Sequence, residues 1–225
     1  MSRWAILFAK KPDAGLVKTR LQPEFSLIES AELYANFLKD CMENLAQASV
    51  DHRLIAYTPS DAETTLHKMN KTSQSFEYFS QGPGDLGARL ERAFNFIYSK
   101  GGEFVIALGS DTPTLPTSYI NLAFDLLNSH EVVLGPAMDG GYYLIGSRID
   151  IGNLFKGISW GTENVFEQTI ACLKGISFGM LPPWYDIDRP QDVRFLITHL
   201  RGMHLAGCPI AYNTLSYLER RRSDS

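Results

Sequence analysis

A basic loop follows the first apolar run of the chain, which covers residues 3–9. Lys18 and Arg20 lie two positions apart in this loop, and Gly15 precedes them. In an extended segment this spacing points both side chains the same way, and Gly15 allows close approach of the backbone to a ligand. Lys and Arg supply the positive charge and the donors that a phosphate needs. Two interpretations follow, a phosphate-binding loop or a solvated basic turn.

An aspartate, Asp111, lies in the loop that directly follows the apolar run 104–108, within the stretch Gly109-Ser-Asp-Thr-Pro113. The run lacks alternation, as in a strand covered on both faces, so the loop is expected at the carboxyl edge of a sheet. A carboxylate at such a position can hold Mg²⁺ or Mn²⁺ on the phosphates of a nucleotide. The alternative is a turn or a helix N-cap.

Two further aspartates, Asp186 and Asp188, lie two positions apart near the C-terminal end of the chain. An extended backbone puts both carboxylates on one face, where they repel each other unless a cation lies between them. Pro190 suits the first turn of a helix. Asp188 is therefore either a metal ligand or the cap of that helix, and the two roles are compatible.

Asp139, Gly140 and Gly141 form an acidic, glycine-rich turn before the apolar run 142–146. The two glycines leave backbone N–H groups accessible, and Asp139 is a candidate acceptor of hydrogen bonds from sugar or acceptor hydroxyls. The alternative is a plain hairpin turn of the Asp-Gly type.

A second glycine-rich stretch opens a helical pattern and contains Gly84, Asp85, Gly87 and Arg89. A helix N-terminus favours anions, and glycines admit a flat base or a ribose against the backbone. Arg89 is long enough to reach a phosphate. The alternative is a turn followed by an ordinary helix N-terminus.

Strand-like and helix-like segments alternate along the chain, which predicts an α/β domain with a mostly parallel central sheet flanked by helices. Capping-box patterns at Ser26–Glu29 and Ser60–Glu63 predict two helix starts. We expect strands at 3–9, 52–57, 76–79, 104–108, 131–134 and 142–146, with further helices near 86–97, 117–128, 162–173 and 190–199.

Length and composition fit a single domain, with 225 residues, 44% hydrophobic residues and a formal net charge of -4. The absence of a basic excess argues against a general nucleic-acid binder, and no apolar run is long enough to span a membrane. Residues 214–225 are expected to form a C-terminal tail that is frayed and solvated at its end. Oligomerisation stays open.

The three cysteines, Cys41, Cys172 and Cys208, are far apart and in no CxxC pattern. Free, buried thiols in a reducing cytoplasm are therefore expected rather than disulfides or zinc. The short apolar run at the N-terminus has no small-residue cleavage pattern, so no secretion signal is expected and the predicted location is cytoplasmic.

Six motifs occur in order and together span most of residues 4–200. They are Phe8-Ala-Lys-x-Pro-x-x-Gly15-x-Val-Lys18-Thr-Arg20-Leu, Gly84-Asp-Leu-Gly87-x-Arg89, Gly109-x-Asp111-x-Pro113, Asp139-Gly-Gly-Tyr-Tyr-Leu-Ile-Gly146, Ile158-Ser-Trp160-Gly-Thr162 and Asp186-Ile-Asp188-x-Pro190-x-Asp192. The chain resembles a bacterial family of glycosyltransferases with the GT-A, Rossmann-like fold, described as nucleotide-diphospho-sugar transferases. It is more distantly similar to guanylyltransferases that act on phospholactate or the molybdenum cofactor.

The resemblance implies a role for each loop. Lys18 and Arg20 would contact nucleotide phosphates, while Asp111 and Asp188 would hold Mg²⁺ or Mn²⁺. Gly84, Asp85 and Gly87 would lie near the base or ribose, and Asp139 would face the sugar or the acceptor. Trp160 is a candidate for the acceptor pocket beside Gly140 and Gly141, although a bulky aromatic is more often part of the core.

Three functions are therefore compatible with the sequence. The first is metal-dependent glycosyl transfer from a nucleotide-sugar to a small-molecule acceptor, with Asp139 activating a hydroxyl. The second is nucleotidyl transfer from a nucleoside triphosphate to a phosphorylated small molecule, with release of pyrophosphate. The third is a catalytically silent nucleotide-binding domain, because Gly109-Ser-Asp111 carries one aspartate where many GT-A enzymes carry Asp-x-Asp.

Overall fold

The computed structural model describes residues 1–152, 154–208 and 210–223. Its centre is a seven-stranded sheet with the strand order β3-β2-β1-β4-β6-β5-β7. The strands are β1 (Arg3–Lys10), β2 (His52–Thr58), β3 (Glu77–Ser80), β4 (Phe104–Leu108), β5 (Val132–Pro136), β6 (Tyr142–Ser147) and β7 (Phe178–Met180). Every neighbouring pair is parallel except the two that involve β6. The predicted α/β fold with a mostly parallel sheet is confirmed.

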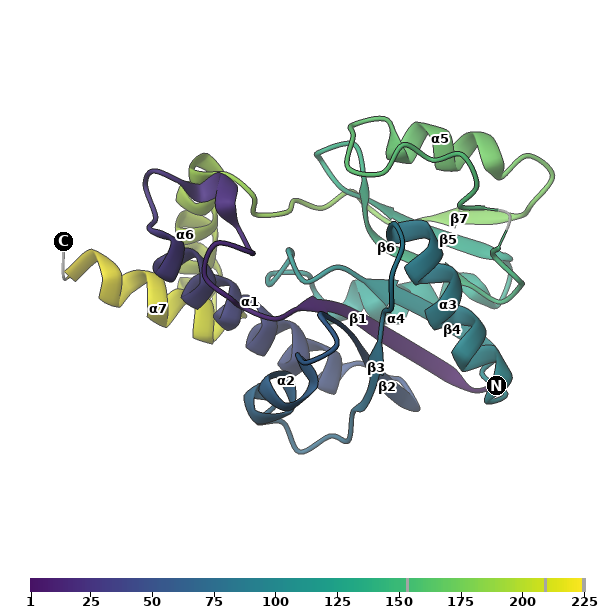
Figure 1. Cartoon of the computed structure of the whole chain (residues 1–225), viewed down its shortest axis with the longest axis horizontal. Coiled ribbons are helices and arrows are strands. Elements are labelled where there is room, and N and C mark those ends of the chain that lie inside the picture. Colours follow the sequence, from purple (N-terminus) through teal and green to yellow (C-terminus); the bar gives the residue numbers. More distant parts are fainter. Residues whose placement is uncertain (153, 209, 224–225) are drawn as a thin grey trace.

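Helices cover both faces of this sheet. They are α1 (Leu27–Gln47), α2 (Glu63–Met69), α3 (Leu86–Ser99), α4 (Thr117–Leu127), α5 (Val165–Cys172), α6 (Pro190–Leu205) and α7 (Tyr212–Ser223), with a 3-10 turn η1 at Thr19–Leu21. One core cluster joins α1, α2, α4, α6 and α7 to the sheet, and the other joins α3 and the segment around α5 to its opposite face. Figure 1 shows α6 and α7 to the left of the strands, reached by the light-green segment that follows β7.

Strand β4 shows why an apolar run without alternation predicts burial on two sides. All five of its residues are buried. Phe104, Ile106 and Leu108 belong to the α1 and α4 cluster, whereas Val105 and Ala107 belong to the α3 cluster. The loop behind β4, which carries Asp111, therefore leaves the sheet from its centre.

The two predicted capping boxes have different outcomes. At α1, Ser26 accepts a hydrogen bond from Glu29 N and the Glu29 side chain accepts one from Ser26 N, as predicted. The box at Ser60 is wrong, because α2 begins at Glu63 behind Ala62 and has no side-chain cap. The N–H of Ala62 instead bonds to Pro59 O, so the chain turns once before the helix and Ser60 lies too early to cap it.

The expected tail over residues 214–225 is also wrong where the structure describes it, because α7 runs to Ser223. Leu215 and Leu218 of α7 are buried against the core. Asp40 of α1 accepts hydrogen bonds from the backbone N–H groups of Asn213 and Thr214. A long-range cap of this kind leaves no local sequence signal, which is why a charged C-terminal segment looked like a free end.

The thiol prediction holds in part. Cys41, Cys172 and Cys208 are free, but only Cys41 is buried. Within the three described ranges, no helix combines the length and the apolar character needed to cross a membrane.

The strand order creates a crevice between β1 and β4. From β1 the chain proceeds to β2 and β3 on one side, and it then returns to the other side of β1 to form β4. In open α/β sheets, the carboxyl ends of the strands at such a reversal diverge, and ligands bind there. The loops that carry Lys18 and Asp111 leave the sheet at this point.

Candidate active site

The ammonium of Lys18 lies between acidic side chains from two distant parts of the chain. Its Nζ is 2.6 Å from Asp111 Oδ1 and 2.8 Å from Asp188 Oδ1, and it donates to Ile187 O at 2.6 Å. Only 4% of the side chain is exposed. An ammonium has three donors, and these three acceptors use them all. Lys18 therefore neutralises the two aspartates and is not open to a phosphate in this structure.

This arrangement favours the charged forms of Lys18 and Asp188. Burial opposes the charge of Lys18, but the attraction of Asp111 and Asp188 outweighs it and raises the pKa of the ammonium. Burial likewise opposes the charge of Asp188, and the neighbouring Lys18 and Arg20 outweigh it and lower the pKa of that carboxyl. Lys18 itself adopts a left-handed backbone conformation with φ 49°, which turns the chain toward the acids just before η1.

A second acidic group lies beside this pair. Asp139, Asp186 and Asp188 each offer a carboxylate oxygen, and these oxygens all lie within 4.8 Å of one another. Burial, Asp139 and Asp188 raise the pKa of Asp186 to about 7. Three carboxylates so close together repel one another, and oxygen donors of this kind suit Mg²⁺ or Mn²⁺.

Long-range backbone contacts bring these acids together. Asp139 lies in the turn between β5 and β6, and Asp186 lies in the extended segment behind β7. The two segments run side by side, because Met138 N bonds to Trp184 O and Trp184 N bonds to Pro136 O. The sequence indicated the pair of Asp186 and Asp188 but not the approach of Asp139.

Asp111 was expected to share a metal with Asp188. In the structure it is linked to Asp188 through the Lys18 ammonium, while Asp139 and Asp186 complete the carboxylate cluster. Asp186 was noticed in the sequence for its spacing, and no feature of the sequence favoured it over Asp111 as a ligand.

The alternative in which Asp188 only caps α6 does not hold. The N–H groups of Asp188 and Arg189 both bond to Asp192 Oδ2, at 3.0 Å and 2.6 Å. Since Asp192 caps this helix, the carboxylate of Asp188 stays available at the site.

Three further cations lie in or next to the loop behind β1. Arg20 is 66% exposed, and its Nη1 is 3.5 Å from Asp188 Oδ2. Lys10 is exposed and contributes to the low pKa of Asp188, so it also faces this acid. Lys11 is paired with Asp61 at 2.8 Å and with Asp13 at 3.5 Å. Arg20 and Lys10 are thus the cations best placed to meet an incoming anion.

Backbone conformation and close packing require glycine at two positions of these loops, Gly15 and Gly140. Gly15 has φ +83°, a conformation that L side chains rarely adopt, so the turn itself requires glycine. A Cβ on Gly140 would lie 2.2 Å from Glu163 O, because the turn packs against the segment before α5. Asp139 Oδ1 accepts a hydrogen bond from Gly141 N at 2.8 Å, so the turn and the acidic site coexist.

The stretch 84–89 is built as a helix start. Asp85 is the N-cap of α3 and accepts from Ala88 N at 2.9 Å. Arg89 Nε donates to Gly84 O at 2.9 Å, and its Nη1 donates to Gln81 Oε1 at 3.3 Å. The predicted roles of these residues toward a base, a ribose or a phosphate stay predictions, and the contacts show a turn followed by a capped helix.

Trp160 packs against Gly87 of this helix. A Cβ on Gly87 would lie 2.9 Å from Trp160 Nε1, and the indole also contacts Phe155 and Tyr142 edge-on. Its Nε1 is buried without a hydrogen-bond partner among the residues that the structure describes. Gly87 and Trp160 are therefore a close-packed pair that fixes the segment before α5 to α3.

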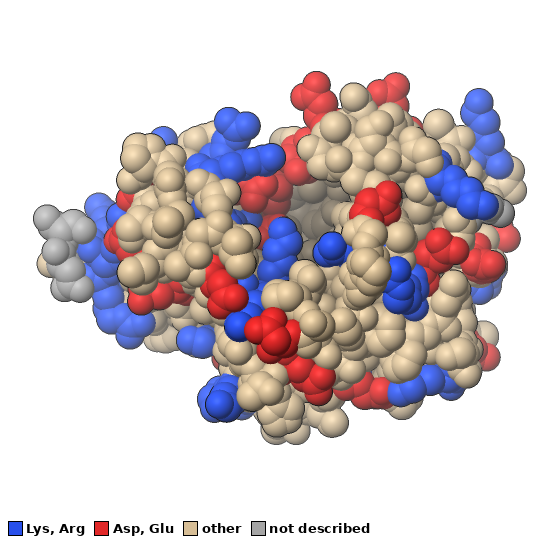
Figure 2. Space-filling view, in the orientation of Figure 1, with Lys and Arg blue, Asp and Glu red and all other residues tan. Residues whose placement is uncertain are grey.

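Figure 2 shows a hollow in the face of the molecule, between the part that holds α6 and α7 and the part that holds α3 and α5. Blue and red side chains lie along its edge, so charges of both signs border the same opening. A site of this kind can hold an anion together with a cation.

The fold of this chain is similar to that of several solved structures. A protein from Desulfovibrio desulfuricans, provisionally named a nucleotide-diphospho-sugar transferase, is 29% identical with a TM-score of 0.86, and the match covers 99% of this chain and 96% of that one. A cytidylyltransferase from Leptospira borgpetersenii is 14% identical with a TM-score of 0.62, over 99% and 96% of the two chains. A Mycobacterium tuberculosis protein solved with manganese is 13% identical with a TM-score of 0.53, over 87% and 97%.

The chain therefore has the fold of the nucleotide-diphospho-sugar transferases. A search of curated proteins gave no match. A family model described as an uncharacterized protein conserved in bacteria, DUF2064, matches residues 37–162, which is more than half of the chain. The chain belongs to the DUF2064 family.

Proposed function

We propose that this protein is a divalent-metal-dependent transferase that takes a nucleotide-sugar and passes its glycosyl group to a small acceptor with a hydroxyl group. The observation that carries the proposal is the charge arrangement at the β1–β4 crevice. Exposed Arg20 and Lys10 lie beside a cluster of three carboxylates, Asp139, Asp186 and Asp188. A metal–diphosphate ligand needs cations on one side and carboxylates on the other.

The name of the Desulfovibrio desulfuricans protein supports the ligand class, since that protein matches over 99% of the chain at a TM-score of 0.86. The manganese in the Mycobacterium tuberculosis structure shows that a protein of this fold can take such an ion. In this chain Asp139, Asp186 and Asp188 would hold the ion, because carboxylate oxygens suit a hard cation. When bound, the ion would neutralise charge on the leaving diphosphate.

Each residue of the site has a separate role in the proposed reaction. Arg20 and Lys10 bind the diphosphate and stabilise the charge that grows on it as the bond breaks. Lys18 stays between Asp111 and Asp188, where it holds the loops behind β1 and β4 in place. Asp139, the exposed member of the cluster, takes the proton of the acceptor hydroxyl on the carboxylate oxygen that would not hold the ion. The acceptor oxygen bonds to the sugar carbon, and the electron pair of the broken bond leaves on the diphosphate.

A donor screen tests this proposal. The full-length protein is incubated with a panel of nucleotide-sugars and Mn²⁺, with cell-extract metabolites as acceptors, and released nucleoside diphosphate is measured. We expect release with at least one donor, its loss in EDTA, and its loss in Asp188→Asn. Lys11→Met, which removes a cation engaged elsewhere, is the matched control and should retain activity. No release with any donor contradicts glycosyl transfer.

Nucleotidyl transfer is the second candidate, because the fold is shared with a cytidylyltransferase and the basic loop would hold a triphosphate equally well. The leaving group separates the two reactions. Pyrophosphate released from a nucleoside triphosphate in the presence of a phosphorylated small molecule would favour this candidate. Nucleotide binding that is unaffected by EDTA, with no release of either product, would identify a catalytically silent domain.

A further inference from the structure

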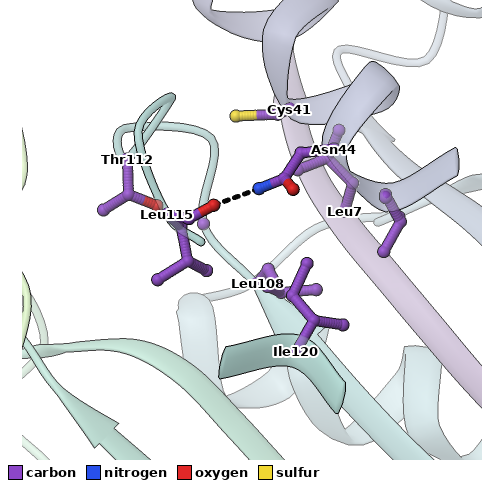
Figure 3. Close-up of a pocket in the computed structure, with 9 residues that line it drawn as sticks. Leu7, Cys41, Asn44, Leu108, Thr112, Leu115 and Ile120 are labelled. Atoms are coloured by element: carbon purple, nitrogen blue, oxygen red, sulfur yellow. Dashed lines mark hydrogen bonds between the residues drawn. The ribbon is translucent and has the colours of Figure 1, made fainter. Parts of the chain in front are cut away.

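One face of α1 supports the loops that meet at the β1–β4 crevice. Tyr34, Cys41 and Asn44 step along this helix at spacings that keep them near one another. The Cys41 thiol donates a long hydrogen bond of 3.9 Å to Ser110 O. Asn44 Nδ2 donates to Leu115 O, as Figure 3 shows for the small cavity behind this loop. The loop that carries Asp111 is therefore held from α1 at several points.

Tyr34 differs from the other two because it contacts both loops at once. Its hydroxyl accepts a hydrogen bond from the backbone N–H of Lys10 at 3.0 Å and lies 2.7 Å from Ser110 Oγ. The residue is 3% exposed. Burial and nearby Asp111 raise the pKa of its phenol, so the hydroxyl stays protonated and can donate as well as accept.

The sheet register explains why a side chain is needed at this point. The pairing of β1 with β4 ends at Leu7 and Leu108, whereas β1 continues beside β2 as far as Lys10 and Thr58. The Lys10 N–H thus extends past the last residue of β4. Tyr34 Oη takes the position of the missing strand partner, at the point where the two strands separate.

The adjacent residues of α1 and of the loops complete this support. The ring of Phe37, one turn after Tyr34, lies 5.8 Å from Lys18 Nζ. Ser110 directly precedes Asp111, and Lys10 ends the strand that leads into the loop of Lys18 and Arg20. Movement of the Tyr34 hydroxyl would therefore displace the cationic loop and the acidic loop together.

We infer that Tyr34 is a positioning residue whose hydroxyl couples the anion-binding loop behind β1 to the acidic loop behind β4. The inference rests on the proposed function, because coupling matters only if nucleotide phosphates bind at the loop behind β1 and a cation binds at the carboxylate cluster, which Lys18 links to the loop behind β4 through Asp188 and Asp111. Tyr34 does not touch the reacting atoms. It holds Lys10 and Ser110 together, and with them the loops that carry Arg20 and Asp111.

The test compares Tyr34→Phe with Tyr98→Phe. Tyr98 is less deeply buried than Tyr34, and its hydroxyl donates to Ser147 O and Ile149 O, beyond the opposite ends of the strands. In the ligand-free proteins, hydrogen–deuterium exchange at Lys10 and at 110–112 is expected to rise about tenfold in Tyr34→Phe and to stay unchanged in Tyr98→Phe. Unchanged exchange in a folded Tyr34→Phe protein overturns the inference, whatever the protein binds.

The second measurement addresses coupling. The Kd of UDP, GDP, CDP and ADP is measured by calorimetry with Mn²⁺ and with EDTA. We expect Mn²⁺ to lower the Kd of the best-bound nucleotide in the wild type. The ratio of the Kd in EDTA to the Kd in Mn²⁺ should be about fivefold smaller in Tyr34→Phe and unchanged in Tyr98→Phe. Ser110→Ala, which removes the other end of the bridge, should show the same loss even if Tyr34→Phe folds poorly.

The outcomes separate the two claims. Equal Mn²⁺ tightening in the wild type, Tyr34→Phe and Ser110→Ala overturns the coupling while leaving the proposed function intact. A wild type that binds none of the four nucleotides overturns the proposed function and the coupling with it. In that case the exchange data still decide whether Tyr34 holds the two loops together.

Discussion

Lys18 shows how a buried charge can be kept in a small site. Its ammonium is almost fully enclosed and has Asp111 and Asp188 within 2.8 Å. Removing one partner of a buried ion pair is costly, because the remaining charges lose their compensation. In Lys18→Met the two aspartates would repel each other and the neighbouring carboxylates.

We therefore expect Lys18→Met to lower the free energy of unfolding by about 2 kcal/mol, measured by urea denaturation in EDTA. This expected loss lies at the low end for buried ion pairs because the side chains of Asp111 and Asp188 are 47% and 32% exposed, so water can solvate their charges when Lys18 is removed. Lys11→Met is the control, since the partners of Lys11 are exposed and little change is expected. Equal destabilisation in both variants would contradict a special role for Lys18.

Asp186 makes stability depend on pH. Its folded pKa is about 7 and its unfolded pKa is about 3.9, so between these values the folded state binds more protons. Stability contributed by this group is thus greatest at low pH and is lost as the pH rises through 7.

Asp186→Asn removes the free-energy cost of holding an ionised carboxylate at position 186 in the folded state. In EDTA we expect the variant to melt about 2–4 °C above the wild type at about pH 8, and to gain much less at about pH 5, where the wild-type carboxyl is already protonated. Thermal melts followed by circular dichroism measure the difference. An equal gain at both pH values would mean that the charge of Asp186 is not the source.

At the scale of elements, the start of α7 depends on α1. Asp40 is 3% exposed, and its carboxylate accepts hydrogen bonds from the backbone N–H and the side chain of Asn213 and of Thr214. Because the first N–H groups of a helix have no partner within it, a side chain from another helix supplies one here.

Asp40→Ala is expected to cost about 2–3 kcal/mol, because it leaves buried donors unpaired. Asp85→Ala, which removes one exposed cap of α3, should cost about 1 kcal/mol. Limited proteolysis tests the location of the effect, since α7 should be cleaved first in Asp40→Ala and not in Asp85→Ala. Simultaneous cleavage throughout the chain would show that α7 does not open independently.

At the scale of the whole molecule, the strand order explains where a ligand should act. Loops from both halves of the sheet meet at the β1–β4 crevice, so a ligand bound there contacts segments that are distant in sequence. Ligand binding should therefore stabilise the whole fold by mass action.

A thermal-shift screen measures this effect. At a concentration about 100 times its Kd, a nucleotide-sugar with Mn²⁺ should add about 2.7 kcal/mol of stability, and Asp188→Asn should lose the part that depends on Mn²⁺. The same ligand with EDTA is the control. A shift that is unaffected by EDTA would show that the ligand binds without a metal, and an EDTA-sensitive shift that Asp188→Asn leaves unchanged would locate the metal elsewhere.

Much of the fold could be predicted from local patterns. The run 104–108 indicated a doubly covered strand, and Ser26 with Glu29 indicated the start of α1, because both depend on neighbours in the chain. The interpretations of Ser60 and of residues 214–223 were wrong, because a turn at Pro59 and a cap from Asp40 determine the structure of those segments. Neither contact lies within a short sequence window.

The sequence by itself determined which residue types stand at the strand ends, namely a basic loop, a glycine-rich turn and three acidic loops. Only the tertiary structure decided their grouping. Asp139 meets Asp186 because residues 136–138 run beside Trp184, and Lys18 meets Asp188 across 170 positions of sequence. Charge and spacing are properties of a short segment, whereas distance between segments depends on how the strands order themselves and where their ends separate.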